Sequence, residues 1–279
     1  MSYKIIVDSC GELTEEMKES GNFENVPLSM QVGSENIVDD ASFDQADFLR
    51  KIAECSTCPK SSCPSPERYM QSYCTDAEHV YAVTLSAELI GSYNSARLGQ
   101  SLYHEEFGEK DIYVFNSRSA SVGQTLIALK IQECEEAGMD FMQVIDAVEA
   151  YIESQHTYFV LENLDTLRKN GRLTGIKSLM AGALNIKPVM GSTPEGTICQ
   201  LGQARGMKKA LAKMADQIVS EAGDVRDKVL AISHCNCLER AKEVQRMLLE
   251  KLNVKSSLIL DTAGISSMYA NDGGIIVVI

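Results

Sequence analysis

Residues 80–115, VYAVTLSAELIGSYNSARLGQSLYHEEFGEKDIYVF, carry the pattern from which the fold class follows. Two short runs at the ends of this stretch, 80–85 and 111–115, are rich in β-branched and aromatic residues and predict two strands. The stretch between them breaks at Gly91 and continues as a helix that starts near Ser92. A strand, a helix and a second strand in this order are typical of the crossover unit of a parallel sheet.

Short apolar runs alternate with helical patterns in the same way along most of the chain. Further strands are predicted at 4–7, 158–161, 187–190, 197–201, 229–233, 258–260 and 275–278. The clearest helix covers 141–151, where apolar residues recur every three or four positions and share one face. Gly138 ends the helix before it, and another helix is predicted at 238–252. The fold class is therefore α/β.

The pattern changes near residues 153–157, which predicts a division of the chain. Residues 188–201 predict a hairpin, because the sequence GSTPEG at 191–196 is rich in the residues that turns require. A hairpin places antiparallel neighbours in the second sheet, so a mixed sheet is expected there. We therefore expect two domains, residues 1–155 and residues 156–279.

The composition excludes several classes of protein. Of the 279 residues, 44% are hydrophobic and 23% are charged, as in a globular protein with a core. The 26 Lys and Arg against 39 Asp and Glu give a net charge of -13, which repels phosphate backbones, so nucleic acid is not an expected partner. No apolar run approaches the ~18 residues of a membrane helix, and the N-terminal run is too short for a signal peptide. We expect a cytoplasmic protein without stable membrane insertion.

Polar side chains follow several of the predicted strands. The pairs concerned are Asp8-Ser9, Thr84 with Ser86, Asn116-Ser117 and Asp261-Thr262. Ligands of open α/β sheets bind outside the carboxyl ends of the strands, so the recurrence of these pairs predicts a ligand site there. For any single pair, the alternative is that the side chain only caps the next helix.

Two further segments predict anion-binding loops. Residues 61–69 contain two prolines before a helix, so the hydroxyls of Ser61 and Ser62 are held in place. Residues 85–96 break from a strand into a helix at Gly91, which leaves the amides of the helix start free to donate hydrogen bonds. A carboxylate would suit both segments.

Six segments, taken in order, resemble the DegV family of bacterial fatty-acid-binding proteins, and the match spans the whole chain. The segments are Asp8-Ser9, SSCPSP at 61–66, LIGSYNSA at 89–96, Asn116-Ser117, the 164–172 segment ending in LRKNGR, and LNIKP at 184–188. The resemblance implies a Rossmann-like α/β/α domain and a smaller two-layer domain with a mixed sheet. It also implies a buried fatty acid or similar lipid, no catalytic residue and no cofactor, and a separate fatty acid kinase as partner.

The resemblance also implies roles for particular residues. The ligand-binding candidates are Ser61, Ser62, Gly91, Ser92, Asn116, Arg172 and Tyr269. The two serines of the first segment, the Gly91 amide and Ser92 would hold the carboxylate. Arg172 follows Gly171 at a predicted helix end, and its planar guanidinium would suit a second anion such as the phosphoryl group of an acyl phosphate.

Two positions depart from the family pattern. Ile90 stands where the family usually has a serine, which removes one hydroxyl from the head-group site. Residues 268–274 read MYANDGG where the family has a histidine, and Tyr269 is the closest polar substitute. A phenol can donate one hydrogen bond but stays neutral at pH 7. These departures leave open an alternative in which the fold binds a different small molecule.

The cysteines permit a metal site as an alternative. The chain has nine cysteines, an odd number in a long chain, so reduced thiols are expected and not a disulfide framework. Cys55, Cys58, Cys63 and Cys74 cluster and would supply thiolates to zinc or to an iron–sulfur centre. Their spacing matches no established pattern, so no metal is expected. His234 through Cys237 predict a loop at the start of a helix.

Enzymatic alternatives have less support in the sequence. The DegV fold is similar to the substrate-binding subunit of dihydroxyacetone kinases, which hold substrate with a histidine and would suggest a phosphotransfer subunit. The four histidines, His79, His104, His156 and His234, fall in no segment that matches this role. The chain contains neither a phosphate-binding Gly-x-x-x-x-Gly-Lys-Ser/Thr loop nor a Gly-x-Ser-x-Gly nucleophile elbow. We expect a protein that is not an enzyme.

Overall fold

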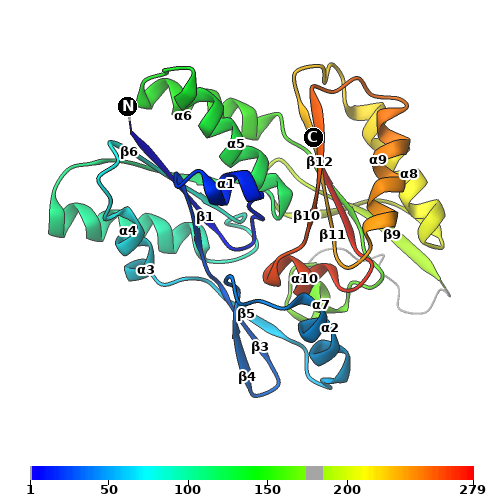
Figure 1. Ribbon diagram of the computed structural model, residues 1–279. Helices are drawn as coiled ribbons and strands as arrows, with labels where there is room; N and C mark the ends of the chain where they lie inside the picture. Colours follow the sequence, from blue (N-terminus) through cyan, green and yellow to red (C-terminus); the bar gives the residue numbers. More distant parts are fainter. Residues whose placement is uncertain (1, 174–184) are drawn as a thin grey trace.

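A computed structural model describes residues 2–173 and 185–279, and within these residues the strands form three sheets (Figure 1). The first sheet has the order β2 (Phe23–Val26), β1 (Tyr3–Asp8), β6 (His79–Thr84), β7 (Asp111–Asn116). The second has the order β10 (Ile198–Arg205), β9 (Ile186–Ser192), β8 (Thr157–Val160), β13 (Ile275–Val278), β11 (Val229–His234), β12 (Ser256–Asp261). The third has the order β4 (Glu35–Val38), β3 (Ser29–Val32), β5 (Lys60–Ser62).

The first sheet is entirely parallel and carries helices on both faces. Side chains alternate along β1, so Ile5 and Val7 pack with α1 (Glu15–Glu19), α5 (Val122–Glu136) and α6 (Phe141–Glu153). Ile6 points to the other face, where α3 (Pro66–Tyr73) and α4 (Ser92–Phe107) pack. The predicted crossover unit and the α/β class are therefore confirmed. Pro66 occupies the first turn of α3 behind the N-cap Ser65, as residues 61–69 predict.

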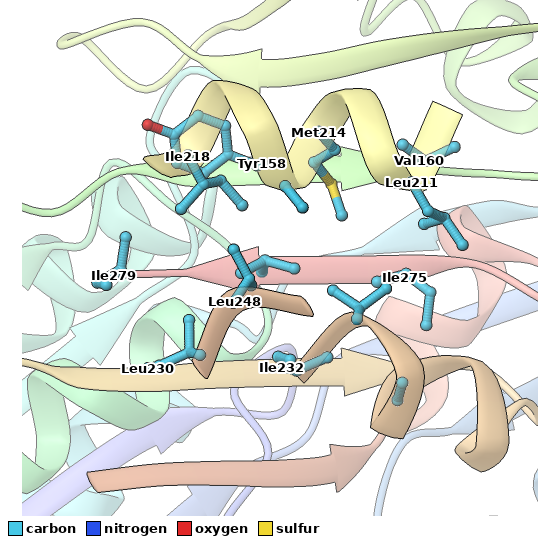
Figure 2. Packing of buried hydrophobic residues seen from close by; sticks show 14 of the residues in the cluster. Tyr158, Val160, Leu211, Met214, Ile218, Leu230, Ile232, Leu248, Ile275 and Ile279 are labelled. Atoms are coloured by element: carbon cyan, nitrogen blue, oxygen red, sulfur yellow. The ribbon is translucent and has the colours of Figure 1, made fainter. Parts of the chain in front are cut away.

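The second sheet is mixed, as the hairpin at 188–201 predicts. Only β11 and β12 are parallel neighbours, and the other neighbouring pairs are antiparallel. One face is covered by α8 (Met207–Glu221) and α9 (Leu238–Leu249). In this core, Figure 2 shows Met214 and Ile218 of α8 on the side of β8, near Tyr158, and Leu248 of α9 on the side of β11, which carries Leu230 and Ile232. The opposite face of the sheet is turned toward α5, α10 (Gly264–Ala270) and the loops of the first sheet (Figure 1).

The strands predicted from the sequence are all present, with ends that differ by a few residues. The four strands β2, β3, β4 and β5 were not predicted. The predicted turn at 191–196 is partly wrong, because β9 continues to Ser192 and the turn closes with the Thr193 amide donating to the Thr197 carbonyl, 2.8 Å. Gly191 lies inside β9, where an added Cβ would lie 2.7 Å from Leu201 Cδ1.

The third sheet and three short helices lie below the other two sheets in Figure 1. The three helices are α2 (Gln45–Glu54), α7 (Asp165–Lys169) and α10. Met30 of β3 and Phe48 of α2 share a core with Ile265 and Met268 of α10. No helix in the described residues is long and apolar enough to cross a membrane.

Apolar and polar contacts join the first and second sheets. Val122 and Leu126 of α5 pack against Ala231 and Val278 of the second sheet. The strands of the first and third sheets, β1 to β7, precede residue 155, and the strands of the second sheet, β8 to β13, follow it. We retain the division into residues 1–155 and 156–279 as a proposal.

The tip of the β9–β10 hairpin reaches the loops after β6 and β7. Ser86 Oγ donates to the Gly196 carbonyl, 2.8 Å, and the Ser119 and Thr157 hydroxyls lie 2.6 Å apart. Gly196 has φ +95, and a Cβ there would contact Ser86 Oγ and lie 2.7 Å from Arg118 Cα. The tip therefore has no room for a side chain.

Gly196→Ala is expected to lower the free energy of unfolding by roughly 2–4 kcal/mol, because backbone strain and a steric clash add. Urea unfolding would measure the loss. Gly108→Ala is the matched control, since Gly108 has φ +90 and nothing within 4 Å of the added Cβ. Equal losses in the two variants would contradict the close packing of the hairpin tip.

Candidate ligand-binding site

A cavity lies between the carboxyl edge of the first sheet and the open face of the second. The loops after β1, β6 and β7 line it with Cys10, Leu85, Leu89, Ile90 and residues 118–121. The second sheet and its connections line it with Thr157, Phe159, Leu161, residues 191–192 and 196–198, and Ile276. The α7 and α10 segments line it with Leu167, Arg172, Ile265, Ser266, Tyr269 and Ala270. The cavity has a volume of about 100 Å³, which is room for several water molecules. This is the edge at which open α/β sheets bind ligands.

The floor of the cavity is apolar and comes from two central strands. Ile276 of β13 pairs with Phe159 of β8 in the antiparallel register, so both side chains stand on the same face. Ile275 and Val277 point the other way and are fully buried in the core under α8 and α9. Ile276 stays half-buried although β13 is a central strand, because the space in front of it is the cavity.

Two polar residues of the cavity lining, Arg172 and Tyr269, form a small cluster with Ser61, which is not itself part of the lining. The Ser61 and Tyr269 hydroxyls are 2.9 Å apart, and either can be the donor. Arg172 donates from Nε to the Leu89 carbonyl and from Nη1 to the Asn170 carbonyl. Burial raises the pKa of Tyr269, while the Ser61 hydrogen bond and the Arg172 charge oppose this shift. The phenol is therefore neutral, and the guanidinium supplies the positive charge of this Ser61–Tyr269–Arg172 cluster.

The four remaining candidates, like Ser61, lie outside the cavity lining. Ser62 is exposed at the end of β5, and Gly91 is exposed at the start of α4. Ser92 is fully buried near Asp8, and its hydroxyl makes no hydrogen bond of standard geometry in the described residues. Asn116 Oδ1 accepts from the amides of Ala87 and Arg118. The structure thus brings together three of the seven candidates, and the roles of the others stay predictions.

The polar residues at the strand ends hold the loops that line the cavity. Asp8 accepts from the Leu85 amide at 2.8 Å and from Gln124 Nε2 at 2.8 Å, and burial raises its pKa to about 6. With Asn116 it fixes the loops after β6 and β7, so neither side chain acts as the cap of a helix. Asp261 lies at the end of β12, in the other sheet, where it accepts from Gln45 Nε2 of α2 at 2.8 Å.

Two buried carboxyl groups near the cavity were not predicted. Glu12 accepts from Ser121 Oγ at 2.8 and 3.0 Å, and that hydroxyl lies 2.7 Å from Ser233 Oγ of the second sheet. Burial raises the pKa of Glu12 to about 7. Asp39 accepts from the amides of Gly264 and Ile265 and so fixes α10, which carries Tyr269. An acidic residue in a loop is the sole signal that the sequence offers for either.

The four clustered cysteines do not form a metal-binding group in the structure. Cys55 and Cys58 line a surface groove between α2 and α7, Cys63 lies beside Ser95 of α4, and Cys74 is exposed at the end of α3. In residues 2–173 and 185–279, no group of three or more His, Cys, Asp or Glu could hold a metal ion.

One residue of the predicted 184–188 segment, Leu184, lies outside the residues that the structure describes.

Comparison with known proteins identifies the family. The model of the DegV family, described as "Uncharacterised protein, DegV family", matches residues 2–279. A DegV domain-containing protein of Streptococcus gordonii is 33% identical over 278 residues, which cover 99% of this chain and 98% of that protein.

Two solved structures share the whole fold. A DegV family protein from Ruminococcus gnavus, described with vaccenic acid, is 69% identical, has a TM-score of 0.98 and is covered over 100% of both chains. The Fatty Acid Kinase (Fak) B3 protein of Streptococcus pneumoniae, loaded with linoleic acid, is 31% identical with a TM-score of 0.91, over 100% of this chain and 99% of that one. The α/β fold predicted from the sequence is therefore the fold of these structures, and the chain belongs to the DegV family.

Proposed function

We propose that this protein binds a long-chain fatty acid in the cavity between the two larger sheets and presents it to a separate fatty acid kinase. The observation that carries the proposal is an apolar cavity that meets a positively charged polar cluster at its wall. An acyl chain with a carboxylate has the same two parts. The proposal is supported by the relatives described with vaccenic and linoleic acid, one of which is named as a fatty acid kinase B protein.

The energetics suit this ligand. Burying an acyl chain contributes ~0.8 kcal/mol per methylene, so a long chain supplies on the order of 10 kcal/mol before the cost of association. A charge-assisted hydrogen bond to the carboxylate adds roughly 1.5–3 kcal/mol. The chain therefore provides most of the affinity, and the head group sets the orientation.

The polar cluster can recognise a carboxylate without a histidine. The Ser61 and Tyr269 hydroxyls carry two hydrogens, of which their mutual bond uses one, so the other is free for a ligand. Arg172 adds a permanent positive charge within the same cluster. These two features compensate for the missing family histidine. We assign Ser61, Arg172 and Tyr269 to the head group.

We also propose that the protein is not itself an enzyme and that it acts in the cytoplasm. Cys10 is the one thiol in the described cavity lining, and burial raises its pKa well above the ordinary value, so it is protonated and a poor nucleophile. None of the four histidines lines the cavity that the described residues form. Ester hydrolysis or ATP turnover by the isolated protein would contradict this proposal.

Mass spectrometry of the purified protein tests the proposed function directly. The native protein is expected to carry one fatty acid per chain, which denaturation and extraction release for identification. An empty protein that also fails to take up added long-chain acids would refute the proposal and favour a different small molecule.

Arg172→Gln is expected to weaken the binding of a long-chain acid about 10-fold or more, because a charge-assisted hydrogen bond is lost. The methyl ester of the same acid should bind the variant and the parent protein equally, since the ester has no charge. Competition against a fluorescent fatty acid measures both. Arg168→Gln, on the exposed side of α7, is the matched control. Equal weakening of acid and ester would contradict the assignment of Arg172 to the carboxylate.

A further inference from the structure

A second hollow lies on the surface next to the ligand site. Its wall includes the end of α2, the loop 55–59, α7 and Asn271 with Asp272. Cys55 and Cys58 both line it, with two residues between them in sequence, and both are partly exposed. The backbone bends at Ser56 and Thr57, between the two cysteines. Two thiols at this spacing, facing one groove, form a candidate dithiol centre.

The two thiols have different surroundings. Cys55 Sγ lies 3.2 Å from Thr57 Oγ1, and this hydrogen bond lowers the pKa of Cys55. A lowered pKa increases the fraction of thiolate, which is the nucleophile in thiol–disulfide exchange. Cys58 Sγ accepts a hydrogen bond from Asn170 Nδ2 at 3.5 Å. Cys55 is thus suited to react first and Cys58 to react second.

Asn170 connects this pair of cysteines to the head-group cluster. Its Nδ2 also donates to the Pro59 carbonyl at 3.0 Å and the Thr166 carbonyl at 3.0 Å, and its own carbonyl accepts from Arg172. Ser61, the partner of Tyr269, follows Pro59 by two residues in β5. A movement of Cys58 and Pro59 therefore changes the supports of both Arg172 and Ser61.

We propose that Cys55 and Cys58 form a reversible disulfide that loosens the grip of the cavity on its ligand. The oxidant is a low-molecular-weight organic disulfide. The Cys55 thiolate attacks one of its sulfurs, forms a mixed disulfide and releases one thiolate. The Cys58 thiolate then attacks Cys55 Sγ and releases the second thiolate. Two protein thiols are oxidised, one organic disulfide is reduced to two thiols, and the Asn170–Cys58 hydrogen bond is lost.

The test combines peptide mapping with ligand binding. The full chain is incubated with glutathione disulfide, alkylated and digested, and a peptide containing both Cys55 and Cys58 is expected to have lost two hydrogens. In the same samples, the affinity for a fluorescent long-chain acid is expected to fall about fivefold or more, the lower range of coupling between linked sites. Dithiothreitol should restore the parent affinity.

Matched variants identify the cysteines responsible. Cys58→Ser should keep the glutathione adduct on Cys55 and lose the change in affinity, whereas Cys74→Ser, an exposed thiol elsewhere, should behave like the parent protein. The absence of the disulfide at excess oxidant, or an adduct that never resolves, would overturn the proposal. A disulfide that forms without changing affinity would overturn the coupling to the cavity.

The effect on affinity rests on the proposed function, but the disulfide does not. A reduced protein that binds no fatty acid would refute the proposed function, and peptide mapping would still report whether Cys55 and Cys58 pair. The two failures are therefore distinguishable.

Discussion

Ile276→Trp is expected to weaken the binding of a long-chain fatty acid about 100-fold while the fold is retained. Ile276 stands on a central strand and faces the cavity, so a larger ring at this position would occupy the space of the acyl chain. Excluding four methylenes removes ~3 kcal/mol at ~0.8 kcal/mol each, which corresponds to about two orders of magnitude in affinity. Titration with a fluorescent acid measures the loss.

The stability of the same variant shows whether the ring enters empty space. Thermal unfolding without ligand should change little, because the ring fills a cavity and does not overpack a core. Met142→Trp is the control, because Met142 is 60% exposed on α6 and does not line the cavity. If Ile276→Trp unfolds, the smaller step Ile276→Phe gives the same comparison. Unchanged binding in a folded variant would show that the acyl chain lies elsewhere.

The sequence predicted those elements whose residues carry a clear local pattern. The β6, β1 and β13 strands contain the apolar runs VYAV, IIV and IIVV because their centres are buried, and such runs can be recognised without the fold. The β4 strand could not be recognised, because Glu35, Asn36 and Val38 are exposed and no alternation of apolar residues remains. The β5 strand consists of Lys60, Ser61 and Ser62, whose composition is that of a loop.

The residues of the candidate site were harder to predict from the sequence than the strands. Ser61 and Tyr269 are separated by 208 residues, so their contact depends on the packing of β5 against α10. Glu12 and Asp39 are acids in loops, and only the tertiary structure buries them. The family resemblance supplied Ser61 and Arg172 as candidates. The buried carboxyl groups that hold α5 and α10 in place carried no such signal.

Glu12→Gln is expected to raise the free energy of unfolding at pH 8 by about 3 kcal/mol. Burial raises the pKa of Glu12 from 4.5 to about 7 in the folded protein, and each pKa unit corresponds to about 1.4 kcal/mol. At pH 8 the folded state therefore contains a buried charge that accepts hydrogen bonds from the Ser121 hydroxyl and the Ala263 amide, whereas the glutamine is neutral. Urea unfolding of both proteins measures the difference.

The pH dependence of this difference identifies its cause. A carboxyl group with a raised folded pKa contributes stability that is fully present below pH 4.5 and is lost as the pH rises through about 7. The gain from Glu12→Gln should therefore shrink as the pH falls from 8 and vanish near pH 4.5. Asp8 and Asp39, with pKa values raised to about 6, titrate in the same window, but they are common to both proteins and cancel in the difference.

The control is Glu239→Gln, at an exposed position of α9, where a change within about 0.5 kcal/mol is expected at every pH. A loss of stability in Glu12→Gln that is independent of pH would mean that the hydrogen bonds to Ser121 require both carboxylate oxygens. Glu12 accepts a hydrogen bond from Ser121, the N-cap of α5, whose hydroxyl also contacts Ser233 of the second sheet, so the Glu12 charge acts where the two halves of the cavity join. A stabilised variant should accordingly also release bound fatty acid more slowly, because the two halves then separate less often.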